Sequence, residues 1–169
     1  VEWAGFPRLQ TLDEYFGLIA SYLKEHPQTG GRANIGFEIL CDDWRYYCLE
    51  NPPMFLAGYP NDGCAIVDAG TQKASVYDTI PEARQYYQKL CEMYNQGVVD
   101  PETFTLSYNQ YIDRIAEGNV LGFVDQYWNV MGAQNRLYAE GKADCTYVPF
   151  AITAREGLEG SYNCREYQI

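Results

Sequence analysis

Three helix-start signals divide this 169-residue chain and constrain its fold more than any other feature. They read TLDE at Thr11, TIPE at Thr79 and SYNQ at Ser107, each a hydroxyl residue followed three positions later by Glu or Gln. In such a capping box the hydroxyl accepts a hydrogen bond from a helical amide, and the Glu or Gln side chain reaches back to the cap. We therefore expect a helix to begin at each of these positions.

Proline or glycine follows each of the three segments. The first helix is expected to run to about Glu25 and stop at Pro27, with QTGG as a loop. The second should end at Gly97 and the third at Gly118, because glycine readily adopts the left-handed conformation that closes a helix. Helical spacing predicts these inward-facing residues: Tyr15, Leu18, Ile19 and Tyr22 in the first helix, Ala83, Tyr87, Leu90 and Tyr94 in the second, and Tyr108, Ile112 and Ile115 in the third.

Short apolar runs alternate with these helices. Strands are predicted at Ile35–Leu40, Val120–Val124 and Cys145–Phe150, and the runs 64–70 and 73–77 should form a small hairpin. A short helix is expected after Asp42 or Asp43, broken at Pro52 and Pro53, and another at about 130–140 before Gly141. This alternation predicts one α/β domain, residues 1–169, with a short mixed β-sheet and helices on both faces.

Two strand exits carry unusual residues for plain turns. The strand ending at Leu40 leads into Cys41-Asp42-Asp43-Trp44, and the strand ending at Val124 leads into Asp125-Gln126-Tyr127-Trp128-Asn129. Ligands of α/β sheets bind outside the carboxyl ends of the strands, so both turns are candidate binding segments. The competing interpretation is structural: Asp125 caps the next helix, Trp128 packs in the core, and either Asp42 or Asp43 is a helix cap.

Charge and aromatic content narrow the class of ligand. The chain has 12 basic and 23 acidic side chains, a net charge of -11, and its basic residues form no cluster. This argues against nucleic acid and anionic membrane surfaces as partners and favours a neutral or cationic small ligand. The chain has 16 Tyr, 7 Phe and 3 Trp. Tyr and Trp combine an apolar face with a polar edge, which suits a ligand-binding groove that is partly exposed to water.

Metal sites and cofactors are not expected. Six cysteines occur without a C-x-x-C pair, and His26 is the one histidine, so a zinc site or a Cys-His catalytic pair is disfavoured. Six cysteines allow 15 complete pairings, and both disulfides and free thiols remain open. No apolar run approaches the roughly 20 residues of a membrane-spanning helix, so any targeting signal would lie outside this sequence.

Several tracts resemble one family. The succession LQTLDEYF, IGFEIL, EARQYYQKLCEMYNQGVVDPETF and IAEGNVLGFVDQYW is similar to one lobe of the family 1 extracellular solute-binding proteins. These are the ligand-capturing subunits of ATP-binding-cassette (ABC) importers, and the carbohydrate-type lipoproteins of Gram-positive bacteria are the most similar subgroup. The strongest match is Ile115 to Trp128, and six cysteines are many for such a protein.

The resemblance implies a periplasmic-binding-protein-like (type II) lobe, the second of a two-lobed molecule whose first lobe is absent from this chain. It implies capture of a sugar or oligosaccharide in an interlobe cleft and delivery to ABC permease subunits, by a protein held on the extracellular face of the membrane through a lipid anchor outside this sequence. Hinge closure around the ligand would create the form that the transporter recognises. Carried over by position, the ligand-binding residues are Asp42, Asp43, Trp44, Asp125, Gln126 and Trp128, with Tyr46, Tyr47, Tyr127 and Asn129 as neighbours.

The chemistry of these residues suits a sugar. The C–H faces of a sugar ring pack on aromatic rings, and its hydroxyls need both donors and acceptors, which Asp, Gln and Asn supply. Two other functions remain open. Asp42, Asp43, Asp125 and Glu38 include candidates for the carboxylate pair of a glycoside-processing enzyme, and exposed tyrosines would suit a protein-interaction module.

Overall fold

A computed structural model describes residues 1–59, 65–68 and 70–158, and it has a mixed α/β fold with about 49% helix, 14% strand and small sheets. The α/β class predicted from the sequence is therefore confirmed. The chain divides into two compact units. Unit 1 contains Val1–Tyr15, Glu50–Lys89 and the described part of Phe150–Ile169, and unit 2 contains Phe16–Leu49 and Leu90–Pro149. No helix within the described residues is long and apolar enough to cross a membrane.

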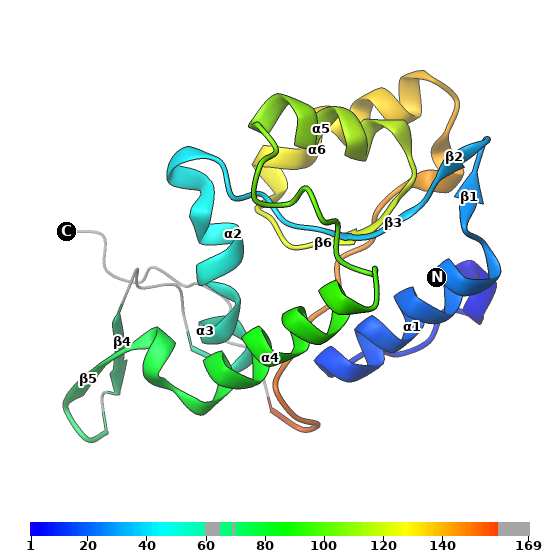
Figure 1. Cartoon of the computed structure of the whole chain (residues 1–169). Coiled ribbons are helices and arrows are strands. Elements are labelled where there is room, and N and C mark those ends of the chain that lie inside the picture. The colour runs from blue at the N-terminus through cyan, green and yellow to red at the C-terminus, as the bar shows by residue number, and fades with distance from the viewer. Residues whose placement is uncertain (60–64, 69, 159–169) are drawn as a thin grey trace. The chain divides into compact units, whose positions relative to one another are not determined.

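Unit 2 is organised around two parallel strands, β3 (Ile35–Glu38) and β6 (Val120–Phe123). Ile35 lies opposite Val120 and Phe37 opposite Gly122, and Phe37 also bridges to Val99. The segment at Val98 approaches β3 so closely that a Cβ atom at Gly36 would lie 2.5 Å from the Val98 carbonyl oxygen. The two strands predicted at these positions are confirmed, and they run side by side (Figure 1).

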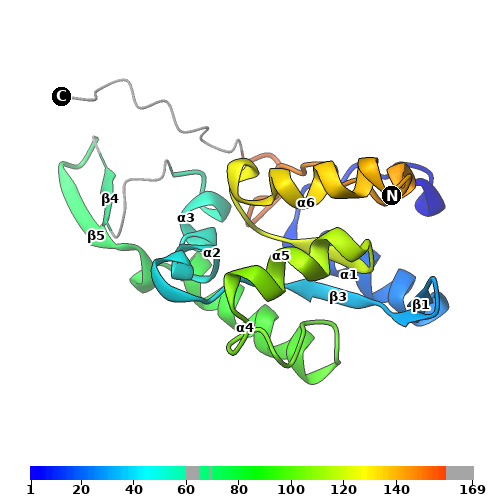
Figure 2. The ribbon, with the colours of Figure 1, turned by 90° about the horizontal axis from the view of Figure 1, so that it is seen from above.

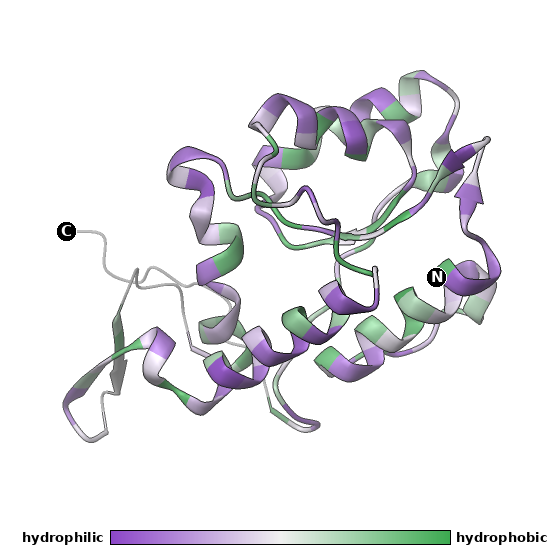
Figure 3. Ribbon diagram, in the orientation of Figure 1, coloured by the Kyte–Doolittle hydropathy of each residue, from purple (hydrophilic) through white to green (hydrophobic). Residues whose placement is uncertain are grey.

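Helices cover both faces of this pair. The helices α5 (Tyr108–Glu117) and α6 (Tyr127–Ala139) lie next to each other on one face (Figures 1 and 2). On the other face lies the unit 2 part of α1 (Leu12–Glu25), where the Phe16 and Phe37 rings meet edge to face at 4.9 Å. Polar and apolar residues alternate along α5 (Figure 3), and the buried side chains of this helix are Tyr111, Ile115 and Ala116.

Two of the three capping boxes form as the sequence predicts. The Thr11 hydroxyl accepts from the Glu14 amide at 3.3 Å, and the Glu14 carboxylate accepts from the Thr11 amide at 3.0 Å. Ser107 and Gln110 make the same reciprocal pair at the start of α5, which ends at Gly118 with a φ of 83°. At the third site Thr79 lies instead in the 3-10 turn η3 (Tyr77–Thr79), and α4 (Pro81–Asn95) begins after it.

The buried stripes of the helices differ from those predicted. In α4 the buried side chains are Ala83, Tyr86, Leu90 and Met93, whereas Tyr87 is half-buried and Tyr94 is exposed. In α5 Ile115 is buried as predicted, but Tyr111 is buried as well, whereas Tyr108 and Ile112 are only half-buried. Tyrosine suits both core and surface, so a helix rich in tyrosine offers two equally good apolar stripes and the spacing alone does not choose between them.

Several other elements depart from expectation. The predicted QTGG loop forms a small antiparallel pair, β1 (Gln28–Thr29) with β2 (Arg32–Ala33), because two glycines with positive φ make a tight hairpin turn. The short helix predicted before Pro52 and Pro53 does end there, at Glu50, but the prolines also begin a further helix, α3 (Pro52–Leu56), where a missing amide costs nothing. Within the described residues the strands form three separate pairs rather than one mixed sheet.

The segment Cys145–Phe150 is not a strand, and this prediction is wrong. It begins at the end of the 3-10 turn η4 (Ala143–Cys145) and continues without a ladder partner among the described residues. Tyr147 holds it in place, because its hydroxyl donates toward the carbonyl oxygens of Ile115 and Val120 at 3.3 and 3.0 Å. Side-chain anchoring therefore replaces the expected backbone pairing.

Unit 1 contains the predicted hairpin, formed by the antiparallel strands β4 (Ala65–Asp68) and β5 (Lys73–Val76). Its small core consists of Met54, Ile66 and Tyr77, with Tyr59 and Ile80 packed against it. Thr153 bridges to Thr11 and ties the described end of the chain to the start of α1. The short element η1 (Glu2–Ala4) also belongs to unit 1. Two further short elements, η2 (Asp43–Tyr46) and α2 (Tyr47–Glu50), lie in unit 2 except for the last residue of α2.

Candidate ligand-binding site

The two strand exits singled out in the sequence meet in unit 2. Because β3 and β6 are parallel, their carboxyl ends lie at the same edge of the sheet, and η2 follows one while α6 follows the other. The rings of Trp44 and Trp128 stack there with centroids 6.0 Å apart and planes within 13° of parallel. The Tyr47 ring lies 5.7 Å from Trp44 and 6.4 Å from Trp128. We call Trp44, Tyr47 and Trp128 the aromatic cluster.

Both tryptophans of this cluster face outward. Trp44 is 57% exposed and Trp128 is 56% exposed, so Trp128 is not the core residue that the structural interpretation required. Exposed rings that contact one another keep most of their apolar surface in water, which is unfavourable unless something else covers it. The aromatic cluster therefore offers a platform for an apolar or half-apolar ligand face.

Asp125 lies beside the cluster and organises it. Its carboxylate accepts from the Tyr47 hydroxyl at 3.3 Å, from the Gln126 amide at 2.6 Å and from the Asn129 side-chain amide at 2.7 Å. It does not cap α6, because Gln126 occupies the N-cap position. Burial raises the pKa of Tyr47, and the neighbouring Asp125 carboxylate raises that pKa further, so the phenol keeps its proton as a hydrogen-bond donor.

The neighbouring acids after β3 have different roles. The Asp42 carboxylate accepts from the backbone amide of Tyr108 at 2.7 Å and so satisfies one of the free donors at the start of α5. Asp43 is exposed and has a φ of 54°, a left-handed conformation that Asp tolerates better than most residues. Asp42 therefore caps α5 and not the short helix that follows it, where its side chain makes no cap bond, and Asp43 is available at the surface.

The other predicted site residues divide between surface and interior. Tyr127 is 68% exposed, Tyr46 is exposed and Gln126 is half-buried. Asn129 is 3% exposed, and its backbone carbonyl oxygen accepts a hydrogen bond from the Tyr108 hydroxyl at 3.2 Å. Asn129 therefore supports Asp125 from behind, and we do not expect it to touch a ligand directly.

Sequence reasoning missed two residues at this edge of the sheet, Arg45 and Tyr108. The guanidinium carbon of Arg45 lies 4.7 Å from the centroid of the Trp44 ring and 4.0 Å from that of Tyr108. The signal available was the run WRYY, in which a cation stands between aromatic residues that stack on it readily. The sequence does not predict the contact of Tyr108 with Arg45, because the two residues lie far apart in the chain and meet only in the folded structure.

Beneath the surface lie two thiols and a phenol. Cys41 and Cys48 are buried, and burial together with the Asp125 charge raises the pKa of Cys48. The same two causes raise the pKa of Tyr111 well above its usual range. Cys48 is an unreactive neutral thiol in this environment. Cys91 and Cys145 are free cysteines as well, and Cys64 and Cys164 lie outside the described residues.

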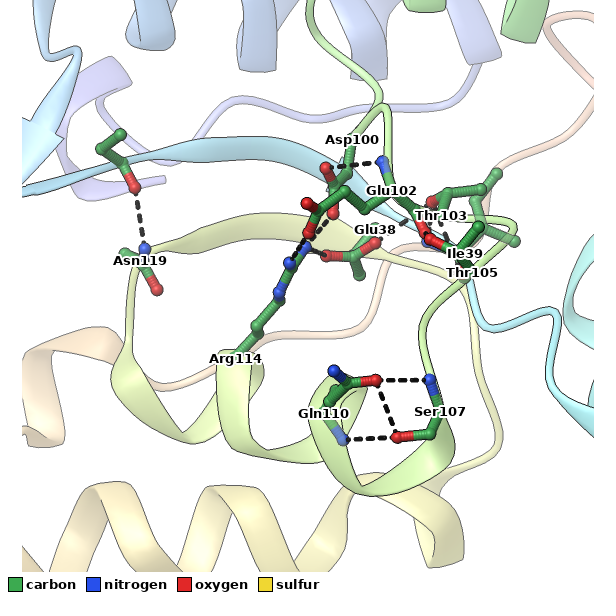
Figure 4. Close-up of polar contacts among 11 residues, drawn as sticks. Glu38, Ile39, Asp100, Glu102, Thr103, Thr105, Ser107, Gln110, Arg114 and Asn119 are labelled. Atoms are coloured by element: carbon green, nitrogen blue, oxygen red, sulfur yellow. Dashed lines mark hydrogen bonds and ion pairs between the residues drawn. The ribbon is translucent and has the colours of Figure 1, made fainter.

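A second polar group of residues lies inside unit 2, around Glu38 (Figure 4). Thr103 donates to the Glu38 carboxylate at 3.1 Å, and Arg114 approaches Glu38 at 3.5 Å while pairing closely with Asp100 and Glu102. Burial raises the pKa of Glu38 to about 8, and the nearby Asp100 charge adds to the shift. We call Glu38, Asp100, Thr103 and Arg114 the buried polar cluster.

No group of three or more His, Cys, Asp or Glu side chains in the described part of the chain is placed to hold a metal ion. Comparisons with known proteins found no matching family model, no matching curated protein and no matching solved structure.

Proposed function

We propose that this chain is a ligand-binding lobe of an extracellular solute-binding protein, that its ligand is a sugar or oligosaccharide, and that it delivers this ligand to an ABC importer. On this proposal the fold is a periplasmic-binding-protein-like (type II) lobe, and a lipid anchor outside this sequence holds the protein at the cell surface. The observation that carries the proposal is the stacking of two exposed tryptophans, Trp44 and Trp128, at the joint exit of two parallel strands.

The arrangement supports a sugar because it pairs an apolar platform with polar groups at its edge. Sugar C–H faces can cover the aromatic rings, and each 100 Å² of apolar surface removed from water contributes roughly 2.5 kcal/mol. Asp43 and Gln126 lie at or near the surface and supply acceptors and a donor for hydroxyl groups. Asp125 holds the Tyr47 phenol beside the two indoles.

One lobe alone should bind weakly. Association costs at least about 4 kcal/mol in lost translational and rotational freedom, which cancels much of what a single aromatic platform provides. We therefore expect dissociation constants in the millimolar range, about -4 kcal/mol, for this chain by itself.

The test is a titration of the 169-residue chain with a panel of neutral oligosaccharides, followed by the NMR signals of its three indole N–H groups. We expect the Trp44 and Trp128 signals to shift with millimolar sugar and the Trp3 signal to stay. Trp128→Ala and Trp44→Ala should each abolish the remaining shifts, whereas Trp3→Ala, which removes an indole of unit 1, should leave binding unchanged.

Other outcomes would favour the alternative functions. If no oligosaccharide moves the Trp44 and Trp128 signals, the carbohydrate proposal is wrong. If the chain hydrolyses an aryl glycoside and Asp125→Asn removes that turnover, the glycoside-processing alternative replaces it.

A further inference from the structure

Arg45 is unusual among the partly buried cations of the described residues. Three others, Lys89, Arg114 and Lys142, each pair with a carboxylate. Arg45 is half-buried as well, yet within the described part of the chain it makes no ion pair, and its buried Nε atom has no hydrogen-bond partner. A buried donor without a partner is costly, so this guanidinium is not in its most favourable state.

The two nearby rings explain why Arg45 stays in this position. Its guanidinium carbon lies within 4.7 Å of the Trp44 centroid and 4.0 Å of the Tyr108 centroid, which are cation–π distances. Tyr108 is itself fixed, because its amide donates to Asp42 and its hydroxyl donates to the carbonyl oxygen of Asn129. A cation–π contact does not use the N–H groups of a guanidinium as hydrogen-bond donors, so the terminal nitrogens of Arg45 stay available for other partners.

Two of the acids at this edge of the sheet, Asp42 and Asp125, are already in use, and exposed Asp43 makes no ion pair with Arg45. Asp42 accepts from the Tyr108 amide, and Asp125 accepts from Tyr47, Gln126 and Asn129. Neither makes an ion pair with Arg45. The positive charge at the aromatic cluster is therefore unmatched by any described carboxylate in direct contact.

We propose that Arg45 binds a carboxylate of the ligand, so that the sugar this site prefers is acidic, a uronic-acid oligosaccharide. This rests on the proposed function and names the substrate class of the same site. A carboxylate is planar and matches the guanidinium fork with two parallel hydrogen bonds.

The net charge of -11 does not prevent this binding. Charges farther from the site than about 8 Å are largely screened at physiological ionic strength, while a guanidinium–carboxylate contact is much shorter than that. The net charge slows the approach of an anion, but it does not remove the contact. The terminal nitrogens Nη1 and Nη2 of Arg45 are not among the buried atoms without a partner, so a ligand carboxylate can reach them while Trp44 stays stacked on Trp128.

The experiment compares three trisaccharides of one linkage: trigalacturonate, its methyl ester and neutral galactotriose. The ester has the shape of the acid without its charge. We expect trigalacturonate to bind about tenfold more tightly than either control, because a charge-assisted pair is added. The Arg45 Nε–H signal should shift with the acid alone, and raising NaCl from 0.05 to 0.5 M should weaken binding of the acid only.

Two variants of Arg45 separate the effect of its charge from the effect of its paired hydrogen bonds. In the Arg45→Gln variant the affinities for the acid and for the ester should become equal. Arg45→Lys keeps the charge but loses the paired hydrogen bonds, so it should restore only part of the preference. Backbone amide spectra of both variants will show whether the fold is retained.

Each other result overturns a stated claim. Equal affinity for the acid and its ester, or a preference for the acid that survives Arg45→Gln, overturns the inference and leaves sugar binding intact. A trisulfated galactotriose that alone binds through Arg45 overturns the assignment to a carboxylate. Failure of all these sugars to move the Trp44 and Trp128 signals overturns the proposed function and this inference with it.

Discussion

The buried polar cluster and the aromatic cluster both start from β3 and differ in almost every physical respect. Glu38 is the last residue of the strand and is fully buried, whereas Trp44, a few residues later, is more than half exposed. In the buried polar cluster Thr103 and Arg114 meet the carboxylates directly. In the aromatic cluster the rings meet one another and leave surface in water.

This difference separates a structural role from a binding role. A buried charge must be paired or neutralised within the fold, so the groups around Glu38 are needed to keep the molecule folded. The aromatic cluster gains little stability from its exposed rings and retains capacity for contact with another molecule. We therefore expect changes at the first cluster to affect stability and changes at the second to affect binding.

The largest expected effect comes from Arg114. Arg114→Met would leave the buried carboxylate of Asp100 without its cation, which costs about 3–5 kcal/mol of unfolding free energy. Arg136→Met is the matched control, because Arg136 pairs with Asp113 at the surface and such pairs contribute about 0–1 kcal/mol. Urea denaturation followed by circular dichroism measures both. Similar losses for the two variants would remove the distinction between the clusters.

The next effect is a pH dependence due to Glu38. Its pKa is raised to about 8 in the folded protein, so the folded state holds a proton that the unfolded state releases near its ordinary pKa. Stability from this group is complete at low pH and is lost as the pH rises through 8. Between pH 6 and pH 8 the loss should be about 2 kcal/mol, at 1.36 kcal/mol per pKa unit.

Glu38→Gln isolates this contribution, because glutamine keeps the shape and does not titrate. Denaturation at pH 6, 7 and 8 should show a wild-type stability that falls relative to that of Glu38→Gln. Parallel pH curves for the two proteins would mean that Glu38 is ionised in the folded state.

At the exit of β3, Asp42 should have a smaller structural effect. Asp42→Ala removes the carboxylate that accepts from the Tyr108 amide, and loss of such a cap costs about 1 kcal/mol. Asp43→Asn, one residue away and exposed, should change stability by less than about 0.5 kcal/mol, because Asn tolerates the left-handed conformation of this residue as Asp does. Thermal unfolding compares them, and equal shifts would contradict the assignment of the cap to Asp42.

The smallest effect is the coupling between the two stacked indoles. A double-mutant cycle with Trp44→Ala and Trp128→Ala should give an interaction free energy of about 0.5–1 kcal/mol in stability. The same variants should abolish sugar binding. A coupling above about 2 kcal/mol would mean that the aromatic cluster, too, is part of the stabilising core.

Local signals in the sequence predicted the elements well where one residue type performs one task. The hydroxyl at Ser107, the glutamine three positions later and Gly118 mark the limits of α5, and the structure agrees at both ends. In α4 the helical spacing predicted the wrong tyrosine as buried, because Tyr86 and Tyr87 are adjacent and of the same type, and Tyr86 is the buried one. The strand expected at Cys145–Phe150 was wrong because a strand requires a partner, and the sequence of one segment contains no information about its neighbour.

In the candidate site, too, the sequence predicted some residues and missed others. Residues directly after the strands were found from the sequence, because parallel strands bring their exits together whatever the details of packing. Arg45 and Tyr108 were missed, since Tyr108 lies far along the chain and meets Arg45 only through the fold. The buried polar cluster was missed for the same reason, because Glu38, Asp100 and Arg114 come from three separate segments.

The close approach at Gly36 gives a way to recognise distant relatives of this chain. Any larger residue there would place a Cβ atom 2.5 Å from the Val98 carbonyl oxygen, whichever ligand the protein binds. A relative that takes another ligand is free to replace Trp44 or Arg45, but while it keeps this strand arrangement it must keep the glycine. Newly found sequences are therefore best aligned on the glycine of IGFE, and the residues after the strand can then be compared as a record of changing specificity.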